Sequence, residues 1–185
     1  MWWSRVARPA LHAWAAADQP LRLVEQTVAK DEPQALACYG LLARWWPDPT
    51  TPTEEMWLRF VEGRPVSAVT TEFLAWCSEQ AAAAGKTALL LIWDNASWHL
   101  SRAVRSWIAA HNRGVKATGQ GVRLVVCHLP SKSPWLNPIE AKWVHGKRRV
   151  VAPTRLLSME ELEARVAAAL GANHADHLTM PPKVA

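Results

Sequence analysis

The sequence predicts an α/β domain in which a mixed β-sheet is flanked by helices. The continuous apolar run Thr87–Asp94, closed by an acid, suits a strand buried on both faces, and Val122–Leu129 indicates another buried strand. Apolar residues at three- and four-residue spacing, typical of amphipathic helices, stand between and after these runs. The chain has 185 residues, half of them hydrophobic, which suffices for one domain with a sizeable core. We expect this domain to span 1–172 and the stretch 173–185 to form a C-terminal tail.

The first half of the chain predicts a hairpin followed by a helix. Ala35–Ala43 and Met56–Gly63 are short strand patterns, and the proline-rich stretch between them, Trp45–Glu55, reads as an exposed loop. From about Val66 the pattern becomes helical, with apolar residues at three- and four-residue spacing until Gly85 ends the run.

The second half predicts two strands, each followed by helical sequence. After Thr87–Asp94, a helix carries an apolar face and ends in the glycine-bearing stretch 111–121. After Val122–Leu129, a loop leads to a helix from about Pro138. Ser158 and Glu161 form a capping-box pattern for a last helix.

Composition excludes a membrane protein and a disulfide framework. The longest apolar run, Ala88–Trp93, is much shorter than the roughly 18 residues of a membrane helix, and no signal-peptide pattern is visible. Cys38, Cys77 and Cys127 are odd in number and lie in apolar sequence, which favours buried free thiols. We therefore expect a soluble, cytoplasmic protein.

Positive charge is concentrated in one segment. Ser101–Arg149 holds ten of the 21 Lys and Arg residues but only one of the 16 Asp and Glu residues, namely Glu140. A basic run is often only a solvated surface, but a segment of this length with one carboxylate favours a polyanion such as nucleic acid.

Asp94 closes the most hydrophobic strand pattern, in "LLLIWDNASWH". One reading is that Asp94 or Asn95 caps the following helix. The other places Asp94 at the carboxyl end of a central strand, where α/β proteins bind ligands. His99 is either a structural histidine or a contact in the same site.

Glu140 also allows two readings. In "NPIE", Asn137 suits the N-cap, Pro138 the first helical position and Glu140 the third, where its carboxylate closes a capping box. Leu136, Ile139 and Trp143 would pin this turn to the core and hold Glu140 at its border.

Two carboxylates, one at a strand end and one opening a later helix in a basic segment, together favour phosphoryl transfer assisted by a divalent metal. Mg²⁺ binds oxygen ligands and retains several waters, so a few carboxylates and the phosphate complete its shell. Two ions about 4 Å apart would act on the attacking and leaving oxygens. The surrounding Lys and Arg residues would hold the phosphate backbone.

With these residues identified, the sequence resembles the catalytic domain of IS630-group insertion-sequence transposases, relatives of the Tc1/mariner transposases. The matching stretches are "LLLIWDNASWHLSRAVRSWI" and "LPSKSPWLNPIEAKW", and the similarity runs from Met1 to about Gly171. The resemblance implies an RNase H-like fold and an Asp, Asp, Glu triad that holds two Mg²⁺ or Mn²⁺ ions. It makes Asp94 the second catalytic and metal-binding residue and Glu140 the third. The spacing between them exceeds that of the group, and we place the excess in a loop from about Asn112 to Gly121.

The resemblance also assigns supporting residues. Asn95, His99 and Asn137 are expected neighbours of the metal site. The expected nucleic-acid contacts are Lys132, Lys142, Lys147, Arg148 and Arg149.

The chain departs from the family at its beginning. In that fold the first catalytic Asp lies on the first strand, just ahead of a "WWSR"-like segment, whereas only Met1 precedes Trp2 here. We therefore expect the first strand and the N-terminal helix-turn-helix region of such transposases to be missing. Asp31 and Glu32 lie in a polar connector that contains a proline, which makes them poor substitutes for the first Asp.

Three functions follow as expectations. The first is a transposase domain that cleaves and joins DNA strands, in a truncated copy that is weakly active or inactive. Its partners would be transposon ends and target DNA, with a homodimer or a complementing N-terminal half, in a bacterial cytoplasm and associated with the nucleoid. The second is a non-catalytic DNA-binding or interaction fragment of a decayed or frame-split transposase. The third is a different RNase H-like nuclease.

Overall fold

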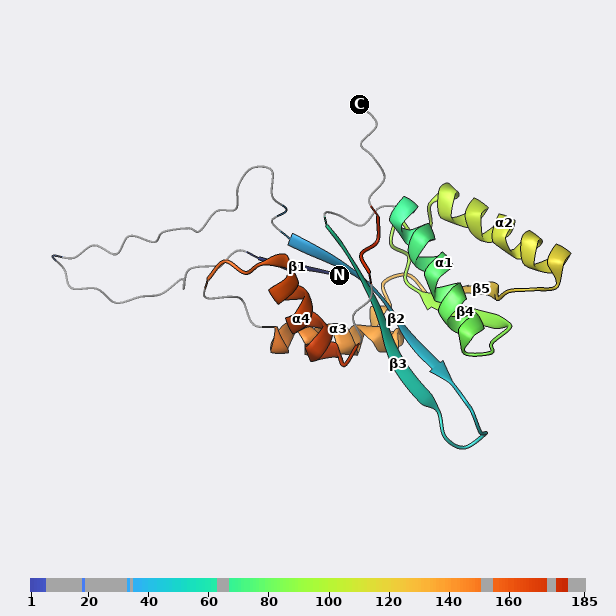
Figure 1. Cartoon of the computed structure of the whole chain (residues 1–185), viewed down its shortest axis with the longest axis horizontal. Helices are drawn as coiled ribbons and strands as arrows, with labels where there is room; N and C mark the ends of the chain where they lie inside the picture. Colours follow the sequence, from blue (N-terminus) through green and yellow to red (C-terminus); the bar gives the residue numbers. More distant parts are fainter. Residues whose placement is uncertain are drawn as a thin grey trace, which may run out of the picture.

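A computed structural model describes residues 1–5, 18, 33, 35–62, 67–150, 155–172 and 176–179. Its elements confirm the predicted α/β class (Figure 1). The strands are β1 (Trp2–Ser4), β2 (Ala35–Trp45), β3 (Thr53–Glu62), β4 (Ala88–Trp93) and β5 (Arg123–His128). The helices are α1 (Ser67–Ala83), α2 (Arg102–Thr118), the short 3-10 helix η1 (Pro134–Leu136), α3 (Pro138–Arg149) and α4 (Met159–Leu170).

The strands form two hydrogen-bonded sheets within the described residues. β1, β2 and β3 are antiparallel in that order, and β4 and β5 form a parallel pair. The sequence predicts one mixed sheet. In the structure, however, the short strand β1 pairs with β2. Among the described residues, no strand pairing joins the three-stranded sheet to the β4–β5 pair. The sequence places the first strand of the fold ahead of Trp2. In the structure, Trp2–Ser4 themselves form a short strand.

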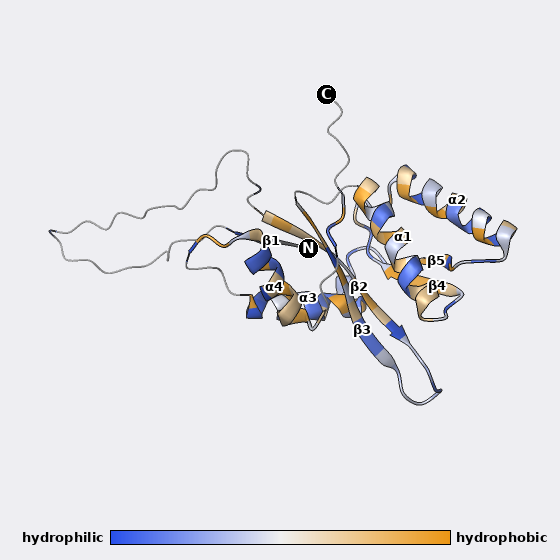
Figure 2. Cartoon of the chain, viewed as in Figure 1, coloured by the Kyte–Doolittle hydropathy of each residue, from blue (hydrophilic) through white to orange (hydrophobic). Residues whose placement is uncertain are grey.

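Alternate residues of β2 point into two different cores. Leu36 and Cys38 lie in a cluster with Ile139 and Trp143 of α3, whereas Ala37 and Tyr39 pack with Phe73 of α1. A third cluster joins β4 and β5 to α1 and α2. The helices α1 and α2 therefore form one layer and α3 and α4 the other, with the β2–β3 hairpin between them and extending beyond both (Figure 1). Hydrophobic colour follows the inner part of this hairpin and fades toward its tip (Figure 2).

The helix α2 corrects the predicted loop at 112–121. It continues through Gly114 to Thr118 and ends at Gly119, whose φ of 69° is the left-handed conformation of a helix C-cap. An internal glycine costs a helix only about 1 kcal/mol relative to alanine, and the neighbouring residues compensate for it. Most of the stretch predicted as a loop, residues 112–118, is thus helical.

The parallel pair is buried on one face only, which corrects the prediction of strands buried on both. Leu91 and Trp93 are buried, but Leu90, Ile92 and Val125 are 58%, 47% and 47% exposed. The reason is that α3 and α4 pack on β2 and β3 instead of this pair. Leu136, predicted to help pin α3, is likewise 51% exposed.

The remaining predictions concern the cysteines, the tail and membrane spans. All three cysteines are free, and Cys38 and Cys77 are buried, but Cys127 is exposed on the open face of β5. Within the predicted tail, residues 176–179 pack on the domain, where the Leu178 N–H donates to the Phe60 carbonyl at 2.8 Å. No helix in the described part of the chain is long and apolar enough to span a bilayer. Asp31 and Glu32 lie outside the described residues.

Candidate active site

Asp94 follows β4 directly and does not cap α2. The N-cap of α2 is Ser101, whose hydroxyl accepts a hydrogen bond from the Val104 N–H at 3.2 Å. The Asp94 carboxylate instead uses one oxygen, Oδ1, to accept bonds from the Ala96 N–H at 3.0 Å and from His99 Nδ1 at 2.8 Å. Its second oxygen, Oδ2, accepts no hydrogen bond from a described residue. Asp94 thus keeps one oxygen available at the end of the strand.

His99 is held in place by stacking as well as by this hydrogen bond. Its ring lies 4.5 Å from the ring of Trp93, with 9° between the planes. Burial lowers the pKa of His99, against the opposing effect of the Asp94 charge. Because an ionised carboxylate can only accept, the Nδ1 of His99 carries the hydrogen in this pair. His99 therefore fixes the orientation of the Asp94 carboxylate.

Asn95 ties together the ends of the two parallel strands. Its Nδ2 donates to the Leu129 carbonyl at 2.8 Å, and the Leu129 N–H donates to the Trp93 carbonyl at 3.0 Å. Asn95 therefore follows Asp94 in sequence, and its side chain bonds to the backbone that follows β5.

Glu140 lies in the first turn of α3, and its carboxylate takes no part in capping. Asn137 is the N-cap, but its side chain makes no cap hydrogen bond, and the Glu140 side chain has no hydrogen-bond partner among the described residues. Buried Ile139 and Trp143 hold this turn against the sheet. At Gly40 of β2, an added methyl group would lie 2.5 Å from the Trp143 ring, so glycine permits this close approach.

The charge of Asp94 acts electrostatically on the Glu140 carboxylate. Burial, and next the charge of Asp94, raise the pKa of Glu140 above its ordinary value. Lys147 of the same helix and the backbone nitrogen of Met1 lower it. The Met1 nitrogen donates to the Cys38 carbonyl at 2.9 Å and lies within electrostatic reach of both Asp94 and Glu140. The charges at the end of β4, in the first turn of α3 and at the start of β1 thus lie within electrostatic reach of one another.

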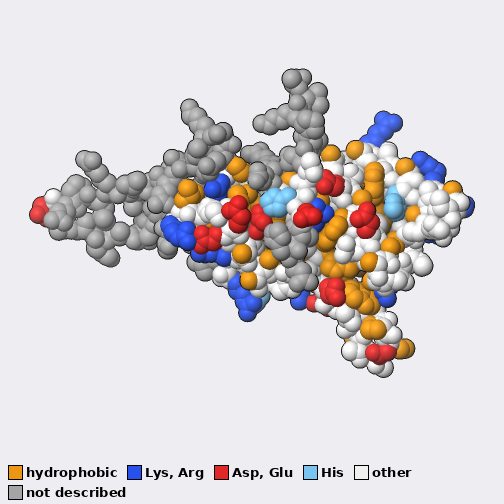
Figure 3. Space-filling model, in the orientation of Figure 1, with side chains coloured by type: hydrophobic (Ala, Val, Ile, Leu, Met, Phe, Trp, Pro, Cys, Tyr) orange, Lys and Arg blue, Asp and Glu red, His pale blue; other side chains and the backbone are white. Residues whose placement is uncertain are grey.

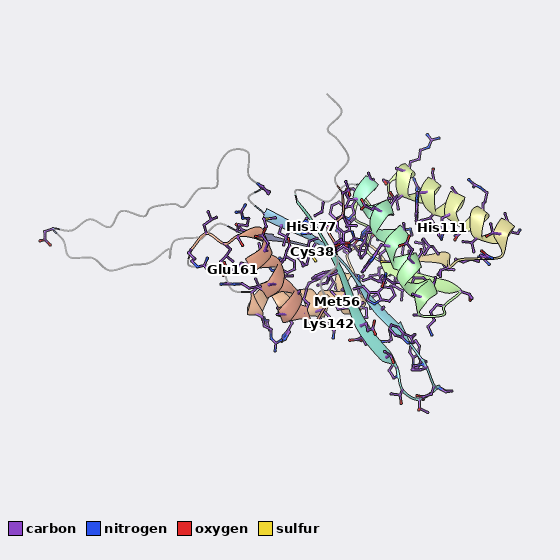
Figure 4. All side chains as sticks on the ribbon, viewed as in Figure 1. Cys38, Met56, His111, Lys142, Glu161 and His177 are labelled. Atoms are coloured by element: carbon purple, nitrogen blue, oxygen red, sulfur yellow. The ribbon has the colours of Figure 1, made fainter. Side chains whose placement is uncertain are left out.

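The candidate nucleic-acid contacts do not all lie here. Lys147, Arg148 and Arg149 are exposed in the last turn of α3. Lys132 is exposed in the loop before η1, in a left-handed conformation with φ of 59°. Lys142 instead forms a salt bridge with Glu54 of the hairpin at 2.8 Å and lines a groove beside β3 (Figure 4).

The donor set suits a divalent metal in part. Carboxylate oxygens are the ligands that Mg²⁺ and Mn²⁺ prefer, and Glu140 together with Oδ2 of Asp94 offers such oxygens with no competing hydrogen bond from a described residue. The described residues contain no group of three His, Cys, Asp or Glu side chains placed to hold a metal ion. The site as described therefore provides two carboxylates.

Two contributors were not predicted from the sequence. Nothing in the sequence indicates that the Met1 nitrogen approaches the carboxylates, because its position depends on the pairing of β1 with β2. The sequence predicts Trp93 as a strand residue and does not predict that its ring supports His99. The close spacing of Trp93, Asp94 and His99 is the signal that is compatible with this support.

Comparisons with known proteins identify the family and the fold. Residues 7–163 match the family described as DDE superfamily endonuclease. A comparison with curated proteins finds no match. Among solved structures, the chain is similar to the Mos1 strand transfer complex, with a TM-score of 0.51, 17% identity and 94% of this chain covered. It is also similar to the Mos1 transposase paired-end complex with the left transposon end, with a TM-score of 0.52, 18% identity and the same coverage.

These structural likenesses confirm the RNase H-like fold predicted from the sequence. The chain spans 46% of the length of the Mos1 protein in both structures, which is less than half.

Proposed function

The chain belongs to the DDE superfamily endonucleases, and from this premise we propose that residues 1–172 are a transposase catalytic domain of the IS630 group. The reaction is cleavage and transfer of DNA strands at phosphodiester bonds. The protein would act in a bacterial cytoplasm, on DNA of the nucleoid.

The observation that carries the proposal is the pairing of Asp94 with Glu140. They come from separate elements, the charge of Asp94 raises the pKa of Glu140, and both residues keep an oxygen free of hydrogen bonds from described residues. Holding two carboxylates close together is unfavourable unless a cation compensates for their repulsion. A structural cap would instead direct these oxygens toward backbone N–H groups.

We assign roles to this chain's residues accordingly. Glu140 and the Oδ2 atom of Asp94 would hold Mg²⁺ or Mn²⁺, two ions in the intact family site. Bound divalent ions supply Lewis-acid stabilisation to the attacking and leaving oxygens. His99 orients Asp94, Asn95 fixes the ends of β4 and β5, and Asn137 begins the helix that carries Glu140. Lys132, Lys147, Arg148 and Arg149 hold backbone phosphates, whereas Lys142 binds Glu54.

A third carboxylate would complete the set next to the Met1 nitrogen. This position is supported by the electrostatic reach of Met1 to both acids. The residue would come from outside the described residues, from a complementing transposase half or from a second copy of the chain. The DNA partners would be transposon ends and target DNA.

Manganese binding tests the paired acids directly. Free Mn²⁺ is measured by electron paramagnetic resonance during titration of the chain and of its Asp94→Asn and Glu140→Gln variants. Each substitution should weaken binding by at least about tenfold, because loss of groups that only orient metal ligands already costs that much. Glu79→Gln, which neutralises an exposed acid on α1, is the matched control and should bind as the unmodified chain does. Equal binding by all four proteins would refute the assignment.

A second function, a DNA-binding fragment without catalysis, is favoured by one observation. The described residues supply two acids where the family uses three. Such a fragment would bind DNA through its basic segment and leave phosphodiester bonds intact. A strand-cleavage assay separates the two functions.

A further inference from the structure

The outer side of α2 carries a stripe of four cations, Arg102, Arg105, Arg113 and Lys116, which we call the α2 stripe. At 100° per residue these positions fall within about 80° of one another around the helix axis. All four side chains are exposed. Arg102 and Lys116 are 14 positions apart, so the stripe is about 21 Å long at 1.5 Å per residue.

The rest of the helix directs the α2 stripe outward. Val104 and Ile108 are buried in the cluster with β4 and β5, and their mean direction around the axis of α2 is about 120° from the middle of the stripe. Lys and Arg side chains project along the outer edge of the molecule over α2 (Figure 3).

The α2 stripe lacks compensating negative charge. The sequence has no Asp or Glu from Ser101 to Gly121. None of the four cations forms a salt bridge with a described residue, unlike Arg44, Arg155 and Arg165. Like charges three residues apart repel each other along a helix, and the stripe contains two such pairs, Arg102 with Arg105 and Arg113 with Lys116. Phosphate groups bound along the stripe would compensate for this repulsion with attraction to each cation.

The α2 stripe is also separate from the basic residues near the carboxylates. Lys147, Arg148 and Arg149 lie on α3, which packs on one face of β2, whereas α2 belongs to the layer of α1 on the other face. From Arg102, eight residues after Asp94, the stripe follows α2 away from the end of β4. The far end of the stripe, Arg113 and Lys116, lies near the start of β5, because the neighbouring Asn112 bonds to the backbone of Leu124.

We propose that the α2 stripe is a second DNA-binding surface, which contacts backbone phosphates of a duplex other than the one at the paired carboxylates. Its length corresponds to the rise of about six base pairs along a duplex axis, at 3.4 Å per step. Because it recognises phosphates and no base edges, binding is independent of sequence. This inference rests on the proposed action on DNA and adds a place for a second duplex.

The salt dependence of DNA binding tests the α2 stripe. A labelled 30-base-pair duplex is titrated at several chloride concentrations with the full chain and with its Arg105→Ala/Arg113→Ala/Lys116→Ala variant. Each lost phosphate contact should make the slope of log Kobs against log salt less negative by about 0.9. Alanine is the best helix former, so α2 should persist, as circular dichroism would verify.

Two triple variants serve as controls. Arg44→Ala/Arg155→Ala/Arg165→Ala removes the same charge from residues that already have acidic partners and should leave the slope unchanged. Lys147→Ala/Arg148→Ala/Arg149→Ala should also make the slope less negative, independently of the α2 stripe. If the α2 variant kept the slope of the unmodified chain while the α3 variant gave a less negative slope, the second surface would be overturned and the proposed DNA function would stand. A binding constant independent of salt in the unmodified chain would overturn both.

A bridging assay tests whether the second duplex is a different molecule. The chain, bound to an immobilised duplex, should capture a free labelled duplex, and the α2 variant should lose this capture while still binding the immobilised one. Capture that persists in the α2 variant contradicts the proposal.

Discussion

Glu140 shows most directly the difference between a structural and a functional side chain. It occupies the helix position where a capping box would use it, yet its carboxylate has no hydrogen-bond partner among the described residues, and burial and Asp94 raise its pKa. Such a residue lowers the stability of the metal-free fold at neutral pH, because its charged form is desolvated and repelled.

We therefore expect Glu140→Gln to stabilise the chain. In the presence of a chelator at pH 7, the melting temperature should rise by at most about 2–4 °C, which corresponds to no more than roughly 1 kcal/mol in a domain of this size, because solvent screens the partly exposed carboxylate. Differential scanning calorimetry measures the change, with Glu79→Gln as the neutral comparison. A lower melting temperature for Glu140→Gln would indicate that the carboxylate has a structural partner.

At this scale the sequence predicted the two acids but not their surroundings. Asp94 and Glu140 were found because each follows a recognisable pattern, a strand end and a helix start. Whether the Asp94 oxygens serve a helix could not be decided, since Ser101 and Asp94 are both good caps and only the backbone path selects between them. The bond from His99 to Asp94 depends on a turn whose shape is not visible in sequence.

Among the elements, the β2–β3 hairpin is tied to α3 by Glu54. Its carboxylate accepts from Lys142 of α3 at 2.8 Å and from Arg44 of β2 at 2.6 Å. The bond from Lys142, and to a smaller extent the bond from Arg44, lower the pKa of Glu54 below its ordinary value. A carboxyl group with a lower pKa in the folded state adds stability above its unfolded pKa, and this contribution is lost as the pH falls through the folded value.

Glu54→Gln should accordingly lower stability in a pH-dependent manner. At pH 7 the loss should be on the order of 1 kcal/mol or less, as for exposed ion pairs. It should shrink as the pH falls below the unfolded glutamate pKa of about 4.3, and it should be lost once the pH passes the lower folded pKa, where Glu54 becomes protonated. Urea unfolding at several pH values measures both effects. A loss of equal size at every pH would mean that the charge of Glu54 plays no part.

The elements themselves were largely predictable, and their limits and exposure were not. The strands and helices lie close to their predicted positions, because periodicity identifies an element from its own residues. The end of α2 was misplaced because Gly114 suggests a break that the neighbouring residues override. The open face of β4 and β5 was missed because an apolar run shows what a strand can bury, not what packs on it.

For the whole molecule, the number of acids at the site limits catalysis. We expect the chain alone to show no cleavage of a DNA substrate with Mg²⁺ or Mn²⁺, since the described residues place two carboxylates together. Nicking of a supercoiled plasmid measures this, and Asp94→Ala is the control for contaminating nucleases. Cleavage that Asp94→Ala abolishes would contradict the expectation and show that another acid of the chain completes the set.

The open face of the parallel pair affects how the protein behaves in solution. Leu90, Ile92 and Val125 form an exposed apolar surface, while the α2 stripe and the α3 cations form charged ones. Raising the salt concentration releases bound nucleic acid from the charged surfaces. Strongly excluded salts such as sulfate, in contrast, strengthen contacts between apolar surfaces. Concentrated sulfate that strips the protein of nucleic acid would thus also promote its precipitation, so chloride is the better wash during purification.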